Sequence, residues 1–388
     1  MTTKYVLIRN LAILCIVCNL LFWFFPFPPI IWRLSLVVLS IIAMLNKKVY
    51  LPCEKAVLLF TAFNLLHFLI CYLWKTPSTS LIGNVLSGLL SLSLFSSLSE
   101  KGVMQEKTMV IVGIVLIISS ALCYYYYDNL LLDKTEMDVT TNSYSEYFLM
   151  LLPLLFFIKK PVLKWSILLI CVFFLILGAK RGNIIAAVLP LLILLKQQLK
   201  ESKHSVWAKI LTIVLVVGVV YLVYYWVGSN AYLMSRVEQT REGDSSGRDR
   251  IYKAAWNLWH DSNNTFITLF GYGYDGVVSK LNVAAHSDWL EILVDYGLVG
   301  IMLYLLVYFR FVRQIRSTKD KKTRAVLISA ISILFIKSIY SMSFNTSTLP
   351  MLMISLGTAL GRYKRKQVLW KESFFSAQTS NREVPNDR

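Results

Sequence analysis

The side chains that could do chemistry in this chain are one histidine and several cations at boundaries between apolar and polar sequence. Lys180 and Arg181 stand between two apolar runs, within Gly178-Ala-Lys-Arg-Gly182. His286 follows a long polar interval that also carries Arg248. A histidine with its ordinary pKa of about 6.5 can take up a proton near neutral pH. A guanidinium group can hold a phosphate through two parallel hydrogen bonds. These residue types favour a general base acting beside a bound anion.

The rest of the chain predicts an all-α polytopic membrane protein. Hydrophobic residues make up 56% of its 388 residues. The apolar runs are continuous and long enough to cross a bilayer, and we expect about 12 transmembrane helices. The expected spans are residues 8–25, 30–45, 56–74, 81–98, 108–125, 144–158, 162–179, 182–195, 207–227, 291–310, 324–340 and 346–361. Residues 1–227 would hold spans 1–9, residues 228–290 a large outer loop with an amphipathic helix, residues 291–361 spans 10–12, and residues 362–388 a basic tail.

The net charge of +18 does not indicate a nucleic-acid partner. Lysine and arginine gather in the cytoplasmic loops of membrane proteins, and their placement here puts both termini inside. Cations on the outer face break this rule at Lys180-Arg181 and in the large loop. A bound anion is the simplest reason for keeping them there.

Each group of cations also has a structural interpretation. Lys180-Arg181 could be a snorkelling pair that contacts lipid headgroups. Arg248 and Arg250 fall in the first turn of the expected amphipathic helix, where a cation is unfavourable unless an anion offsets it. Asp244 and Asp249 could supply that anion, and so could a bound pyrophosphate.

His286 and an acidic stripe mark the start of the tenth span. Counted along a helix, His286 shares a side with Leu290, whereas Asp288, Glu291 and Asp295 form a separate stripe. His286 could be a general base or a hydrogen-bonded interfacial histidine. The stripe could hold loop arginines, line a cavity or orient His286, and the residues leave these three options open.

A glycine-rich turn, Gly271-Tyr-Gly-Tyr-Asp-Gly276, precedes this span. It matches G-x-G-x-x-G, but no strand–helix unit surrounds it, so we expect a pocket-shaping turn rather than a dinucleotide site. Its Tyr272 is a candidate substrate-binding residue. The sequence holds no metal-ligand constellation and no Walker A motif, so we expect neither metal nor cofactor.

Three of these motifs together resemble the O-antigen polymerase and O-antigen ligase family of bacterial envelope glycosyltransferases. They are the Gly178–Gly182 junction, the Gly247-Arg248 start of an amphipathic helix, and the Gly-Tyr-Gly turn followed by His-Ser-Asp-Trp-Leu-Glu at residues 286–291. The resemblance covers about 125 residues, from Gly178 to Phe309. It implies a GT-C-like fold in the bacterial inner membrane with a periplasmic active site.

The resemblance also implies substrates and roles. The substrates would be glycans carried on undecaprenyl pyrophosphate, with no metal in the transfer. Arg181 and Arg248 would bind the pyrophosphate, and His286 would deprotonate the acceptor hydroxyl. Lys180, Arg250, Arg241 and Tyr272 would be further substrate-binding residues. A chain-length regulator and a flippase would be partner proteins.

Several functions stay open at this point, among them that of a protein O-glycosylating relative of the family. The favoured one is polymerisation of repeat units into O-antigen or capsular polysaccharide. The first alternative is a ligase that transfers finished polymer to lipid A–core. The second is a transporter of lipid-linked sugars. A transporter would have charged residues deep within several spans and two halves of related sequence, whereas this chain has few deep polar residues and dissimilar halves.

Overall fold

The computed structural model describes residues 2–380 apart from residues 26, 48, 75–76, 132–140 and 179, and apart from residues 202–246 except 218, 221, 225, 234 and 238. Every regular element in this part of the chain is helical, which confirms the all-α polytopic class. Apart from residues 218, 221 and 225, the expected span 207–227 lies outside the described residues, and so does Arg241.

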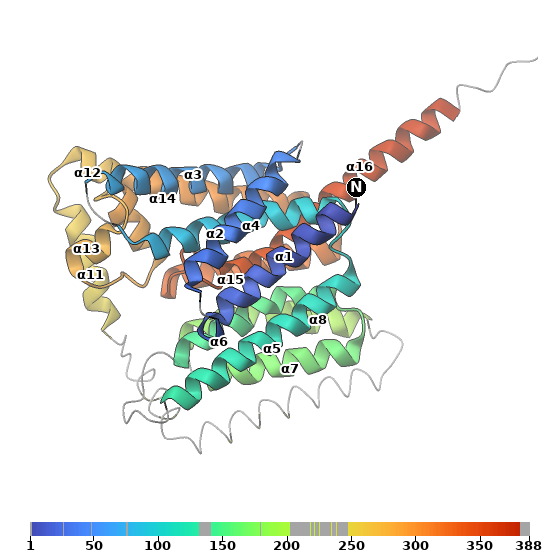
Figure 1. The fold of residues 1–388 in the computed structure, drawn as a ribbon, viewed down its shortest axis with the longest axis horizontal. Coiled ribbons are helices and arrows are strands. Elements are labelled where there is room, and N and C mark those ends of the chain that lie inside the picture. Colours follow the sequence, from blue (N-terminus) through green and yellow to red (C-terminus); the bar gives the residue numbers. More distant parts are fainter. Residues whose placement is uncertain are drawn as a thin grey trace, which may run out of the picture.

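The first part of the chain forms a series of long helices connected by short segments (Figure 1). They are α1 (Thr2–Leu20), α2 (Pro29–Leu45), α3 (Pro52–Tyr72), α4 (Thr79–Glu100), α5 (Glu106–Leu131), α6 (Thr141–Leu151) with the 3-10 helix η2 (Leu152–Phe157), α7 (Pro161–Leu177) and α8 (Arg181–Glu201). A short 3-10 helix, η1 (Phe22–Phe24), follows α1.

The second part contains three short helices and three long ones. They are α11 (Arg248–His260), α12 (Thr265–Phe270), α13 (Gly276–Leu281), α14 (Asp288–Ser317), α15 (Lys321–Tyr340) and α16 (Leu349–Ser380). Each expected span other than 207–227 overlaps a described helix. Seven of the described helices are long and apolar enough to cross a membrane, and three shorter apolar helices accompany them. The count of 12 spans stays a prediction.

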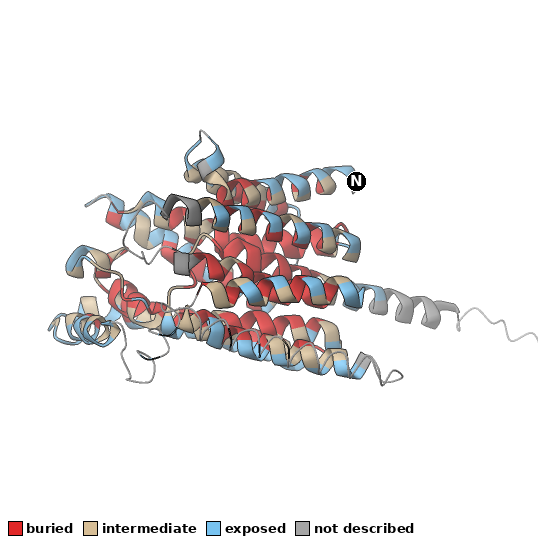
Figure 2. Cartoon of the chain, turned by 90° about the horizontal axis from the view of Figure 1, so that it is seen from below, coloured by how far each residue is buried: buried red, intermediate tan, exposed pale blue. Residues whose placement is uncertain are grey.

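The helices expose apolar side chains outward because lipid, rather than water, is their expected surroundings. On α2, Leu34, Val38 and Ile41 are exposed at helical spacing, whereas Leu36 and Ala43 on the other side are buried. Figure 2 shows the buried residues gathered in the middle of the bundle. In lipid, the hydrophobic effect does not drive helices to associate. Close packing and interhelical hydrogen bonds must therefore hold them together.

Helices α4 and α16 are packed closely at the centre of this bundle. Ser99 on α4 donates a hydrogen bond to the carbonyl oxygen of Thr358 on α16 at 2.9 Å. Small side chains such as these allow two helices to approach and bond directly, which membrane helices use in place of hydrophobic association.

The segments expected in the cytoplasm meet at one end of the bundle. Glu106 at the start of α5 pairs with Lys159 and Lys322, at 2.7 Å and 3.1 Å. Lys364 on α16 pairs with Glu100 on α4 at 2.7 Å. Helices α11–α13 lie at the opposite end, away from the N-terminus (Figure 1). The structure therefore separates the basic loops from the segment that carries His286.

A kink in α14 joins the glycine-rich turn to the bundle. Gly297 has φ 62° inside the helix, which interrupts its backbone hydrogen bonding. The carbonyl oxygens of Val294 and Asp295 accept hydrogen bonds from the backbone N–H groups of Tyr272 and Gly273, at 2.8 Å and 2.9 Å. The turn thus fixes the start of α14 by backbone contacts.

Candidate active site

A polar cavity of about 270 Å³ lies at the end of the bundle that carries His286. Its walls come from α6, the junction between α7 and α8, the segment before α14, and the segment between α15 and α16. The lining residues are Glu146, Tyr147, Lys180, His286, Ser341, Met342, Thr346, Ser347 and Thr348. A base, a cation, a carboxylate and several hydroxyl groups therefore face one space, which suits a polar, charged ligand.

His286 stands just before α14 rather than inside it. The helix begins at Asp288, and His286 has φ 53°, in the left-handed region. The expectation that His286 shares a helical face with Leu290 is therefore wrong, because the left-handed residue turns the chain before the helix starts. The side chain is exposed, so a ligand in the cavity can reach it.

Hydrogen bonds on both sides of His286 fix its backbone. The N–H of Ala285 donates to Glu291 Oε2 at 2.7 Å. The hydroxyl of Tyr252 on α11 donates to the carbonyl oxygen of His286 at 3.3 Å. Ser287 Oγ donates to the carbonyl oxygen of Ser338 on α15 at 3.3 Å. The histidine is therefore presented by a segment tied to three helices.

The surroundings of His286 lower its pKa. Removal of part of the side chain from water is the largest cause, and the positive charges of Arg248 and Lys180 follow. A lowered pKa keeps the imidazole neutral at neutral pH, the form that can accept a proton. Arg248 and Lys180 thus act on the same histidine although 68 residues separate them in sequence.

Lys180 and Arg181 stand where α8 begins. Lys180 lines the cavity and lies 3.7 Å from Glu146, with a fifth of its side chain exposed. Arg181 is the first residue of α8 and is half-buried. At the next residue, a Cβ on Gly182 would lie 3.2 Å from the Cβ of Tyr340, so α8 packs closely on the end of α15 here.

Arg248 also reaches the end of α15. It starts α11 and donates a hydrogen bond from Nη1 to the carbonyl oxygen of Tyr340 at 2.7 Å. Tyr252, one turn later, shares its hydroxyl proton between the carbonyl oxygens of His286 and Ile339, each at 3.3 Å. The last carbonyl groups of a helix lack partners within it and carry partial negative charge. The structure thus gives Arg248 an anchor that the sequence did not suggest.

The other candidate residues lie elsewhere. Arg250 is exposed on α11 and, like Arg181 and Arg248, is not among the residues that line the cavity. The Tyr272 hydroxyl donates to the carbonyl oxygen of Leu258 at 2.9 Å, and Lys280 lies over the Tyr272 ring at 5.6 Å. Tyr272 therefore connects α11 to the glycine-rich turn. A role of either residue in substrate binding stays a prediction.

The carboxylates of the acidic stripe of α14 accept hydrogen bonds from backbone N–H groups. Asp288 Oδ1 accepts a hydrogen bond from the N–H of Ser343, Glu291 from Ala285 and Asp295 from Val277, at 2.8, 2.7 and 2.8 Å. All three carboxylates are buried. Of the three open options, orientation of the His286 segment is the one that the Glu291 contact fits.

Among the cavity-lining residues that sequence reasoning missed, Glu146 on α6 is the one that carries a charge. It pairs with the buried Lys337 on α15 and accepts a hydrogen bond from Thr348 Oγ1 at 2.5 Å. A lone ionisable residue in an apolar run was the available signal, since such residues are costly in a membrane and tend to mark functional positions. Within the described part of the chain, no cluster of three potential metal ligands is found.

Comparison with known proteins places this geometry in a family context. Residues 166–305 match the family model described as O-antigen ligase. No curated protein matches the chain. The matched segment includes Lys180, Arg181, Arg248 and His286, whereas Glu146 and Lys337 lie outside it.

Proposed function

We propose that this chain, whose residues 166–305 match the O-antigen ligase family model, is a membrane enzyme of O-antigen and lipopolysaccharide synthesis and that it is the polymerase. It joins oligosaccharide repeat units carried on undecaprenyl pyrophosphate into O-antigen or capsular polysaccharide. The growing lipid-linked chain is the donor, and the incoming lipid-linked unit is the acceptor. The reaction takes place at the periplasmic face of the inner membrane, and both termini lie in the cytoplasm.

The observation that carries this proposal is the placement of His286 and Lys180 on one cavity, with Arg248 close enough to lower the pKa of the histidine. A neutral imidazole suits proton removal from a sugar hydroxyl. Cations beside it suit a substrate that carries two phosphates. The combination fits the transfer of a sugar from a pyrophosphate.

The chemical step follows from this arrangement. The acceptor hydroxyl oxygen forms a bond to the anomeric carbon of the donor sugar, and His286 takes the hydroxyl proton. The bond between the anomeric carbon and the pyrophosphate oxygen breaks, and undecaprenyl pyrophosphate leaves with the electron pair. Arg181, Arg248 and Lys180 stabilise the negative charge that develops on this leaving group.

His286→Ala and Arg181→Ala test the proposal in protein confirmed to reach the membrane. Loss of a positioned base lowers the transfer rate by about 10²–10⁴-fold. We expect both variants to fail to restore polymer to a deletion strain. Normal polymer from both variants would contradict the glycosyltransferase mechanism and would turn attention to the transporter alternative.

The match of residues 166–305 to the O-antigen ligase family favours a ligase as the second candidate. A ligase would transfer finished polymer to lipid A–core with the same base and cations. The lipopolysaccharide of a deletion strain separates the two functions. A single repeat unit on core indicates a polymerase, whereas core without O-antigen, together with polymer accumulating on the lipid carrier, indicates a ligase.

A further inference from the structure

Glu146 connects three elements that surround the cavity. It belongs to α6, and its side chain is only 7% exposed. Its carboxylate contacts Lys180 before α8, Lys337 within α15 and Thr348 before α16. The contact with Thr348 spans 202 positions of sequence. Glu146 therefore sets where two cations lie at one wall of the cavity.

The two lysines differ in how firmly they are held. Lys337 is 1% exposed and directly paired with Glu146. A cation buried this deeply requires a partner, because an uncompensated buried charge is strongly destabilising. Lys180 is 20% exposed, lies at 3.7 Å from the same carboxylate and faces the cavity. One carboxylate shared by two lysines leaves an excess positive charge, and Lys180 is the lysine that a ligand can reach.

The backbone of α6 is fixed beside this group. Asn183 Nδ2 on α8 donates to Ser145 Oγ at 2.7 Å. A Cβ on Gly178 would lie 2.4 Å from the Cβ of Ser145, so only glycine allows this approach of α7 to α6. The residue before Glu146 is thus held from both sides of the Lys180 junction.

We propose that Glu146 is a positioning residue that holds Lys180 at the cavity wall, and that Lys180 moves from Glu146 to the pyrophosphate of the substrate when it binds. This inference rests on the proposed function, since it assigns the anion that Lys180 meets. In the empty site Glu146 prevents the Lys180 ammonium from turning away from the cavity. In the bound state Glu146 still neutralises Lys337, and the excess positive charge belongs to the pyrophosphate.

The test measures binding of undecaprenyl pyrophosphate to the full-length chain in detergent. The double variant Glu146→Gln/Lys337→Met removes both members of the buried pair, so it keeps the net charge and leaves neither partner as an unpaired buried ion. We expect its Kd to rise about tenfold, the loss of one well-placed charge-assisted contact. In a Lys180→Met background the same two changes should alter Kd less than about twofold, because the residue through which they act is gone.

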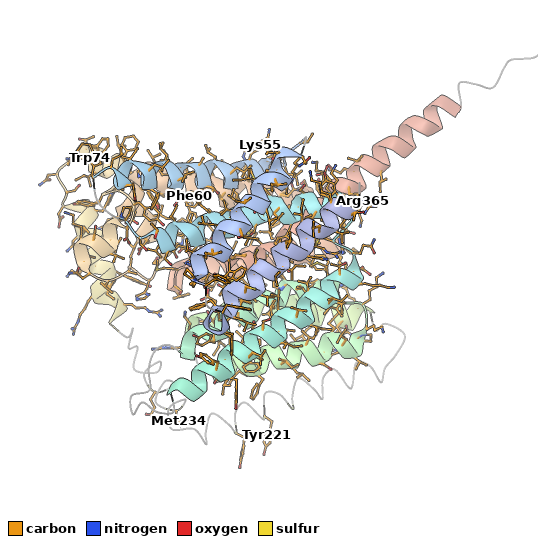
Figure 3. The ribbon with its side chains drawn as sticks, viewed as in Figure 1. Lys55, Phe60, Trp74, Tyr221, Met234 and Arg365 are labelled. Atoms are coloured by element: carbon orange, nitrogen blue, oxygen red, sulfur yellow. The ribbon has the colours of Figure 1, made fainter. Side chains whose placement is uncertain are left out.

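A matched control comes from the opposite end of the bundle. Lys47 pairs with Glu54 there, and the side chains are 1% and 0% exposed. Figure 3 labels Lys55, the next residue, at the end of α3 that lies far from α11–α13. The double variant Glu54→Gln/Lys47→Met should change thermal stability like the site variant but leave the Kd within about twofold of the parent value.

A second variant serves if the double variant does not fold. Glu146→Asp keeps the charge beside Lys337 and shortens the side chain by one methylene group, which withdraws the carboxylate from Lys180. We expect weaker binding in the parent background and no further loss in the Lys180→Met background.

Two results would overturn the inference. Parent-like binding by the variants at Glu146 would mean that this residue serves Lys337 alone. Equal losses of binding with and without Lys180 would mean that the variants at Glu146 do not act through Lys180.

His286→Ala separates the two proposals, since it should bind undecaprenyl pyrophosphate normally and transfer no sugar. If the parent chain does not bind this lipid, the proposed function itself fails.

Discussion

Glu291 accepts a hydrogen bond from the backbone N–H of Ala285 at 2.7 Å, and His286 is the next residue along the chain. Both Glu291 and Ala285 are buried. The first turn of α14 thus holds the segment that presents the histidine to the cavity. We expect Glu291 to act by positioning His286, since Glu291 is not among the residues that line the cavity.

Replacement of Glu291 by alanine should lower both stability and the transfer rate. It leaves a buried N–H group without an acceptor, which costs about 1–3 kcal/mol. It also frees the segment around His286, and a misplaced catalytic group reduces the rate by about 100-fold. Glu291→Gln retains an oxygen that can accept the same hydrogen bond, so it should keep most of the activity. Melting in detergent and transfer rates measure the two effects, and an alanine variant with the parent rate would contradict this role.

The pH dependence of transfer should report the charge of Lys180. A general base works while it is unprotonated, so activity is present above the pKa of His286 and is lost as the pH falls through it. Burial, Arg248 and Lys180 lower this pKa. Lys180→Met removes one of the two cations, so the pKa rises and the loss of activity begins at a higher pH.

The measurement is kcat/KM between about pH 5 and pH 8, the range in which histidine titrates, because kcat/KM reports the pKa of the free enzyme. Lys253→Met, an exposed change on α11, removes the same charge away from the cavity and is the control. A Lys180→Met profile that coincides with the control profile would argue against an interaction of Lys180 with His286.

Arg248 should not be replaceable by lysine. One guanidinium nitrogen is used by the carbonyl oxygen of Tyr340 at 2.7 Å, and the remaining N–H groups stay available for a phosphate. An ammonium group lacks this planar fork and cannot hold two oxygens in the same geometry. We expect Arg248→Lys to reduce transfer at least about tenfold, the loss of one charge-assisted contact. The transfer rates of Arg248→Lys and of the control variant Lys253→Arg are compared with that of the parent. A loss in Arg248→Lys alone would show that transfer depends on the shape of the cation at position 248 and not only on its charge.

The sequence predicts the helical class and the location of His286 because both depend on local composition. Long apolar runs indicate spans, and a histidine at the edge of one is visible without a structure. Glu146 could not be assigned a role in this way, since its partners Lys337 and Thr348 are far away in sequence. The function of the acidic stripe was also hidden, because Glu291 and Asp295 accept hydrogen bonds from the backbone N–H groups of Ala285 and Val277, which no residue type reveals.

The contacts of the glycine-rich turn could not be predicted from the sequence either. Its pattern predicts a turn, and the structure has one, but its contact with the kink of α14 depends on two chain segments that meet only in the fold. Positive φ angles at Gly271 and Gly297 occur at the two sides of this contact. Composition alone could not pair these two glycines.

Gly297→Ala should therefore destabilise the protein more than a glycine replacement at an open position. Gly297 has φ 62°, and a Cβ there would lie 2.5 Å from the carbonyl group of Leu269. Backbone strain alone costs about 1–3 kcal/mol, and the clash must add to it by separating the turn from α14. Gly247 has φ 77°, and a Cβ added there would meet nothing within 4 Å, so Gly247→Ala carries the strain without the clash. Thermal unfolding of both variants in detergent compares them directly, and equal losses of stability would show that the contact between the turn and the kink contributes little.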